Sequence, residues 1–155
     1  MLGTPSAVYG LILYQALIAA MISEDEEAGL ETWLVILYAV LSLVIFFCAH
    51  VFAEWVAAHG PEDLTTAWRR AFSQSLGMLV SAVPPTAVLV ICAAMGMTAD
   101  SAEDWALLSA VVVLAFLGYE AFAIRGYPIW LRIVGGAIGT ALLGVFVIFL
   151  NFLVH

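Results

Sequence analysis

The amino-acid sequence predicts an all-α polytopic membrane protein, a bundle of five transmembrane helices forming one domain over residues 1–155. Of its 155 residues, 65% are hydrophobic and 10% are charged, and the mean hydropathy is +1.12. Five apolar stretches are long enough to cross about 30 Å of hydrocarbon as helices. Their connections are short, which leaves no room for a soluble catalytic domain. Any function must therefore be built from the helices and their ends.

The predicted spans, in chain order, are residues 5–22, 30–58, 78–97, 105–124 and 129–154. The first is interpreted as a helix and not as a signal peptide, because it lacks a basic n-region and a clear small-residue cleavage pattern. Cys48 and Cys92 lie within spans and form no CxxC pair. They are therefore interpreted as packing residues, not as part of a disulfide or zinc site.

The distribution of charge predicts the orientation in the membrane. All four basic residues are arginines, grouped as Arg69 with Arg70 and Arg125 with Arg132. The opposite loops, residues 23–31 and 98–104, hold eight of the 12 acidic residues and no basic one. Because loops rich in Lys and Arg stay in the cytoplasm, we expect a multi-pass protein of the cell membrane with its N-terminus cytoplasmic and its C-terminus outside.

A polar segment between the second and third spans predicts a separate amphipathic helix, a cytoplasmic elbow over residues 61–77. Gly60 ends the preceding helix and Pro61 can start a new one. Leu64, Trp68 and Phe72 recur as an apolar stripe, as in a helix lying at the membrane interface. Two roles stay open for the elbow: gating or coupling, or simple connection and anchoring of two spans.

The third span contains Pro84 and Pro85 near its middle, which predicts a kink or break there because two backbone donors are missing. Carbonyls freed at membrane depth need other partners, and broken helices line the binding sites of several transporter classes. Proline kinks also occur in membrane helices that transport nothing, so the pair alone does not assign a role.

Two stripes of small residues predict close helix packing. One lies on the fifth span and one on the second: Gly136, Thr140 and Gly144, and Ala49, Ala53 and Ala57. The stripes can join helices within one chain or between copies. Five helices leave a narrow interior, so a conducting path forms more easily on the symmetry axis of a homo-oligomer, which we expect.

Ionisable side chains within the apolar spans are the main functional clue. His50 and Glu54, four residues apart, share one helix face. At about 1.5 Å per residue from the cytoplasmic span ends, they and Glu120 lie in the inner half of the membrane. The predicted polar cluster combines these with neighbours that start from the same side: His50, Glu54, Glu120, Gln74, Arg70 and Arg132.

Two interpretations of this cluster are open. In the first it is structural: Arg70 and Arg132 neutralise Glu54 and Glu120, and His50 is hydrogen-bonded. In the second it is a proton or cation site in which the carboxylates are acceptors. A metal site is not expected, because there is no ExxH repeat and no second histidine at the same depth.

Absent motifs narrow the function. Without lysine there is no retinal Schiff base, and there is no TVGYG filter, HExxH, GxSxG or CxxCH motif. The expected function is transport, by a channel or carrier for protons or small cations, in a lipid bilayer, with no cofactor, no nucleic-acid partner and no enzymatic activity. The alternatives are a non-transporting scaffold or accessory subunit of a larger membrane complex and, third, an intramembrane metal-dependent enzyme.

One stretch also carries a family resemblance. Ala49-His-Val-Phe-Ala-Glu54, followed by the arginine-bearing elbow, resembles a group of small uncharacterised bacterial polytopic integral membrane proteins of similar size. The resemblance implies a membrane bundle and no particular activity.

Overall fold

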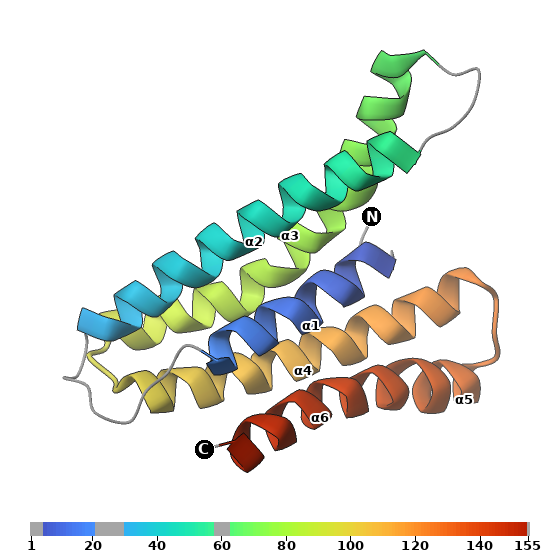
Figure 1. The fold of residues 1–155 in the computed structure, drawn as a ribbon. Coiled ribbons are helices and arrows are strands. Elements are labelled where there is room, and N and C mark those ends of the chain that lie inside the picture. The colour runs from blue at the N-terminus through green and yellow to red at the C-terminus, as the bar shows by residue number, and fades with distance from the viewer. Residues whose placement is uncertain (1–4, 21–29, 58–62, 155) are drawn as a thin grey trace.

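The computed structural model describes residues 5–20, 30–57 and 63–154, and within them every regular element is a helix. In chain order these are α1 (Pro5–Ala20), α2 (Leu30–Ala57), α3 (Leu64–Ala94), α4 (Ala99–Ile124), α5 (Ile129–Leu131), the π-helix η1 (Arg132–Ile138) and α6 (Gly139–Val154). The last three follow one another as a single rod (Figure 1). The predicted all-α helical bundle is confirmed.

Four helical stretches are long and apolar enough to cross a membrane: Thr32–Ala57, Leu64–Ala94, Ala99–Ile124 and Ile129–Leu150. They correspond to the second to fifth predicted spans. The described part of the first span, α1, has 16 residues, about 24 Å at 1.5 Å per residue. Residues 21 and 22 of that predicted span lie outside the described residues.

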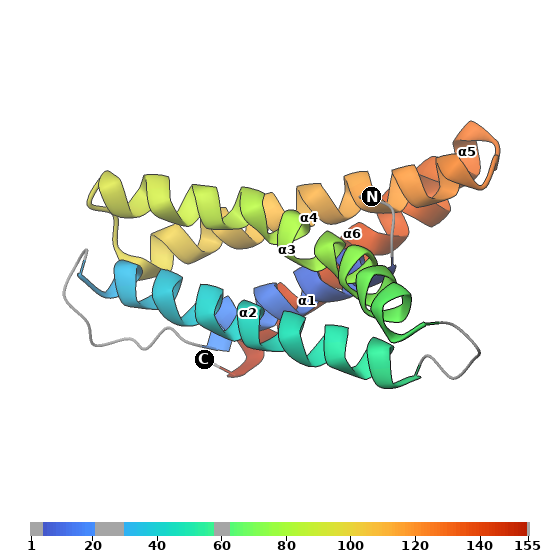
Figure 2. The same ribbon diagram turned by 90° about the horizontal axis from the view of Figure 1, so that it is seen from above.

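Helix α1 occupies the centre of the bundle, where it contacts α2, α3, α4 and α6 (Figure 1 and Figure 2). Tyr14 and Ile18 pack into a buried cluster with residues of α2 and α3. Ala7 and Leu11 pack against α4 instead. All four side chains are fully buried. The short first helix therefore joins the α2–α3 pair to the α4 and α5–η1–α6 pair.

The predicted elbow is not a separate helix, because residues 64–77 form the first turns of α3. The helix continues through Gly77, which is buried, and through Pro84 and Pro85 without ending. At 31 residues, α3 is about 46 Å long and exceeds the hydrocarbon thickness of about 30 Å. Polar residues of a helix that extends beyond the hydrocarbon need not mark a boundary between two helices.

The C-terminal end of α2 and the N-terminal end of α3 project together as an arm, away from α4 (Figure 1). Edge-to-face aromatic pairs join the two helices of the arm: the ring centroids of Phe47 and Phe72 lie 5.4 Å apart, and those of Trp55 and Trp68 lie 6.0 Å apart. Such pairs stabilise by about 0.5–1.5 kcal/mol beyond their burial. The arm is therefore held as a packed helical hairpin.

Helix α4 meets the last rod backbone to backbone. A Cβ atom built on Gly136 would lie 2.6 Å from the carbonyl oxygen of Gly118. Next to this contact, Thr140 Oγ1 donates a hydrogen bond to the Leu114 carbonyl oxygen at 2.6 Å. Gly144 is also buried. The glycine stripe thus faces α4 within one chain, whereas Ala49, Ala53 and Ala57 are exposed on α2.

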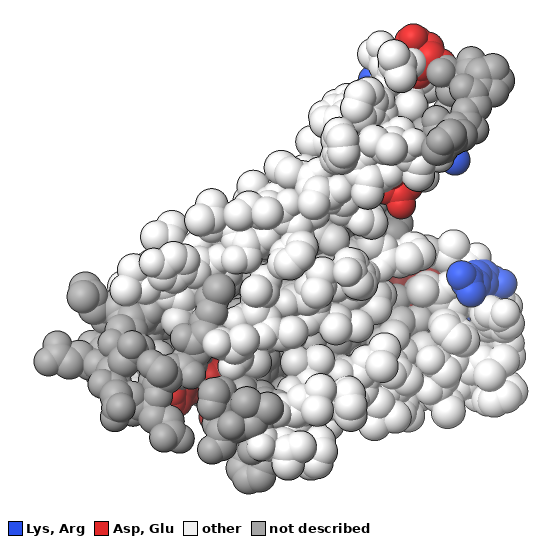
Figure 3. Space-filling model, in the orientation of Figure 1, with Lys and Arg blue, Asp and Glu red and all other residues white. Residues whose placement is uncertain are grey.

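The basic residues are confined to one end of the bundle. All four arginines lie at one end, where α3 begins and α4 turns into α5, whereas Asp100, Glu103 and Asp104 lie at the start of α4, at the other end (Figure 3). The fold therefore gathers the basic residues on one side, as the positive-inside argument requires.

Candidate functional site

A cavity of about 680 Å³ opens between α1, α2 and α3 at the arginine end of the bundle. The space-filling view shows the surface hollowed between the arm and the ends of α4 and α5 (Figure 3). The described residues that line the cavity come from three helices: Pro5, Ser6, Tyr9, His50, Glu54 and Gln74. Five of these six side chains carry polar atoms.

His50 and Glu54 lie side by side on the wall formed by α2. His50 Nε2 is 4.0 Å from Glu54 Oε1, and 29% of the histidine side chain and 46% of the glutamate side chain are exposed. A separation of 4.0 Å is too long for a hydrogen bond. The two groups therefore face a common space without being locked together, and a water molecule or a small rotation can connect them.

A second, smaller cavity of about 220 Å³ shares Glu54 and Gln74 with the first. Its remaining described lining is Ala57, Ala67, Arg70 and Ala71. Of the six residues predicted to form the polar cluster, the structure thus brings together His50, Glu54, Gln74 and Arg70 around two adjoining cavities.

Glu120 and Arg132 are placed apart from these cavities. Glu120 is half-buried on α4 and lines neither cavity. Arg132 Nε donates a 2.6 Å hydrogen bond to the Tyr127 carbonyl oxygen in the α4–α5 turn. The His50–Glu54 ion pair on α2 involves neither of these two residues.

The chain matches no protein-family model, no curated protein and no solved structure. The function must therefore be inferred from the residues of this chain.

The donor set of the site suits a proton or a weakly held cation. Within the described residues, no three side chains of His, Cys, Asp or Glu are grouped to hold a metal ion. The cavity presents one imidazole, one carboxylate, one amide and two hydroxyl groups. Transition metals bound at three or four His, Cys or carboxylate ligands need a denser set.

Sequence reasoning missed the contribution of α1. Ser6 Oγ donates to the Gln74 carbonyl oxygen at 2.6 Å, Ser81 Oγ lies 2.9 Å from the Ala7 carbonyl oxygen, and the hydroxyls of Tyr14 and Thr86 are 2.6 Å apart. Polar atoms thus follow the α1–α3 contact from the cavity inward. The signal was the presence of hydroxyl groups within an otherwise apolar first span.

Proposed function

We propose that the protein is a small integral membrane transport protein, a channel or carrier for protons or small cations, whose inner-side site contains His50, Glu54 and Gln74. The observation that carries the proposal is an ionisable pair, His50 and Glu54, lining a cavity in an apolar bundle. A charged side chain at the bilayer centre costs about 2.5–3.5 kcal/mol on insertion scales, so such residues usually mark ion or proton paths.

The geometry supports proton exchange at the cavity. A neutral imidazole accepts a proton at one ring nitrogen and releases one from the other, and a carboxylate accepts one on either oxygen. His50 and Glu54, 4.0 Å apart, can exchange a proton through one bridging water. The amide oxygen of Gln74 offers a further acceptor on the opposite wall. A small cation would find the same carboxylate and amide oxygens.

Glu54→Gln is expected to reduce flux to the level of empty vesicles, because the amide keeps the size of the side chain but cannot hold a transferable proton or attract a cation. The measurement uses purified protein in liposomes with an internal pH-sensitive dye and an imposed potassium diffusion potential, repeated with sodium and potassium gradients. Asp104→Asn, an exposed carboxylate at the opposite end, is the matched control and should leave the flux unchanged.

The proposal fails if wild-type vesicles carry protons and cations no faster than empty ones. It also fails if Glu54→Gln and Asp104→Asn conduct alike, since the cavity carboxylate would then have no part in transport.

A scaffold or accessory subunit is the second candidate, favoured by the exposed alanine stripe of α2. Ala49, Ala53 and Ala57 are exposed on α2, and stripes of this kind let a second helix approach closely. A homo-oligomer would use the same stripe. A stable hetero-partner in mild detergent, together with function that survives Glu54→Gln, would favour the scaffold over transport.

We propose further that the arginine end faces the cytoplasm, which places the N-terminus inside and the C-terminus outside the cell. In a Cys48→Ser, Cys92→Ser background, a membrane-impermeant thiol reagent added to intact cells should label Ser101→Cys. Ser73→Cys, near the arginines, should be labelled only after the membrane is opened. The reverse pattern would contradict this orientation.

A further inference from the structure

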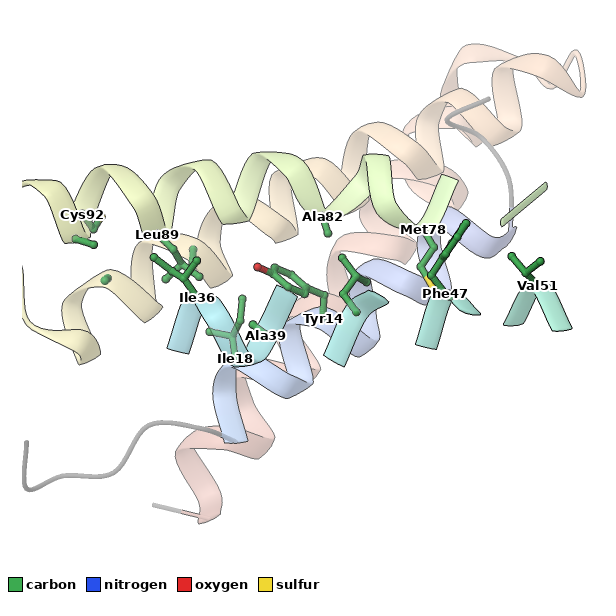
Figure 4. Packing of buried hydrophobic residues seen from close by; sticks show 14 of the residues in the cluster. Tyr14, Ile18, Ile36, Ala39, Phe47, Val51, Met78, Ala82, Leu89 and Cys92 are labelled. Atoms are coloured by element: carbon green, nitrogen blue, oxygen red, sulfur yellow. The ribbon is translucent and has the colours of Figure 1, made fainter. Parts of the chain in front are cut away.

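A layer of buried apolar side chains lies one helical turn further into the bundle than the cavity lining. Met78 lies one turn beyond Gln74 on α3, and Phe47 lies one turn beyond His50 on α2. Met78 is 1% exposed and Phe47 is 8% exposed, and both belong to the same buried cluster (Figure 4). On α1, a Cβ atom built on Gly10 would lie 2.8 Å from Met78 Cβ. Three helices thus close together at one level.

A hydrogen-bonded hydroxyl pair lies beyond this layer. Tyr14 is fully buried, and its hydroxyl lies 2.6 Å from Thr86 Oγ1. Because Thr86 Oγ1 donates to the Ala82 carbonyl oxygen at 2.8 Å, Tyr14 is the donor in the pair. Thr86 is eight residues beyond Met78 on α3, about 12 Å along the helix. The pair is therefore separated from the cavity by the layer of Met78 and Phe47.

Pro84 and Pro85 lie between that layer and the hydroxyl pair. They supply no amide hydrogens to the carbonyl groups four residues earlier, so two bonds of the helical ladder are missing between Met78 and Thr86. Proline is the commonest cause of a helix bend. A bend here would move Met78, on the inner half of α3, relative to Thr86 on the outer half.

We infer that Met78 and Phe47 form an apolar closure at the inner end of the cavity, and that the Tyr14–Thr86 hydroxyl pair is the next proton-transfer site on the path. This inference rests on the proposed transport function and specifies its substrate as the proton. A hydrated metal cation would lose its water at the closure without gaining ligands there, whereas a proton can cross such a layer along a transient file of water molecules.

The hydroxyl pair can pass a proton without a net change of charge. The Tyr14 oxygen accepts a proton from a hydronium ion arriving from the cavity side and gives its original proton to Thr86 Oγ1. The original hydroxyl proton of Thr86 leaves its bond to the Ala82 carbonyl oxygen and passes to the next water molecule. Rotation of both hydroxyl groups then restores the starting arrangement, with Tyr14 again the donor.

The closure is tested by thiol accessibility, which does not depend on transport. In the cysteine-free background, Thr86→Cys should react slowly with a cationic, membrane-impermeant methanethiosulfonate reagent applied from the arginine end, whereas Gln74→Cys in the cavity should react fast. Adding Met78→Ala should speed the reaction at position 86 at least tenfold, as should Phe47→Ala. Met95→Ala, at a methionine that is 70% exposed, should leave it unchanged. Equal reaction rates at position 86 with Met78→Ala, Phe47→Ala and Met95→Ala would overturn the closure.

The hydroxyl pair is tested by proton flux in liposomes. Tyr14→Phe keeps the ring and removes the transferring oxygen, so we expect at least a tenfold loss, whereas Tyr38→Phe, an exposed tyrosine of α2, should have no effect. Thr86→Val should lose flux and Thr86→Ser should retain it. If the wild-type protein conducts protons and Tyr14→Phe conducts them equally fast, the transfer site is overturned and the proposed function is not. Absence of wild-type flux would overturn the proposed function and the transfer site, and the accessibility result would still decide the closure.

Discussion

Replacing Gly118 with alanine is expected to destabilise the bundle by about 1–3 kcal/mol, the range for overpacking in a close-packed interior. The added methyl group would meet the Gly136 carbonyl oxygen and the Thr140 side chain. The first of these is backbone on the opposing rod and cannot rotate away. The methyl group can be accommodated only if α4 and the last rod separate, which would also lengthen the bond from Thr140 to the Leu114 carbonyl.

The effect is measured as the midpoint of unfolding when SDS is titrated into the purified protein in mixed micelles. Gly139→Ala is the matched control, since it adds the same methyl group to a neighbouring glycine of the last rod, where the nearest atom, the Val134 carbonyl oxygen, is 3.8 Å away. Its midpoint should stay level or rise, because alanine favours helix over glycine. Equal midpoints for the two variants would show that the Gly118 contact does not hold the helices together.

Helix number and approximate bounds follow from the sequence because hydropathy reports directly which residues can lie in hydrocarbon. The second span was predicted as 30–58, and α2 is Leu30–Ala57. The predicted 105–124 span instead begins earlier, at Ala99. Residues 99–104 include three acidic residues and Ser101, so their hydropathy does not reveal that they belong to the helix. For the same reason, the polar residues at the start of α3 were predicted to form a separate elbow helix.

The rotation of each helix about its axis is harder to predict. In a soluble protein the polar face marks the outside, but in a bilayer the lipid-facing and protein-facing sides are equally apolar. Helix spacing alone predicts that His50 and Glu54 share one face. Only the fold shows that Gln74 and Arg70 line the same two adjoining cavities. Glu120, at a similar predicted depth, lines neither cavity. The central position of α1 could not be predicted either, because its protein-facing sides are as apolar as a lipid-facing side would be.

Replacing Gln15 with methionine is expected to stabilise the protein by about 1–2 kcal/mol, although the residue lies in the centre of the bundle. Gln15 is fully buried. Its Nε2 donates to the Leu107 carbonyl oxygen at 3.2 Å, but its Oε1 has no hydrogen-bond partner among the described residues. An unsatisfied buried polar atom costs about 1–3 kcal/mol. Methionine has the same unbranched shape without that cost, and it adapts to irregular space.

The same SDS titration measures this change, and Gln74→Met, at an exposed glutamine lining the cavity, should shift the midpoint little. A lower midpoint for Gln15→Met would show that the fold depends on the amide and would refute the argument. Proton flux measured on the same samples adds a second comparison. Since stability and activity often conflict at functional sites, a variant that is more stable yet slower in transport would show that Gln15 serves function at the expense of the fold.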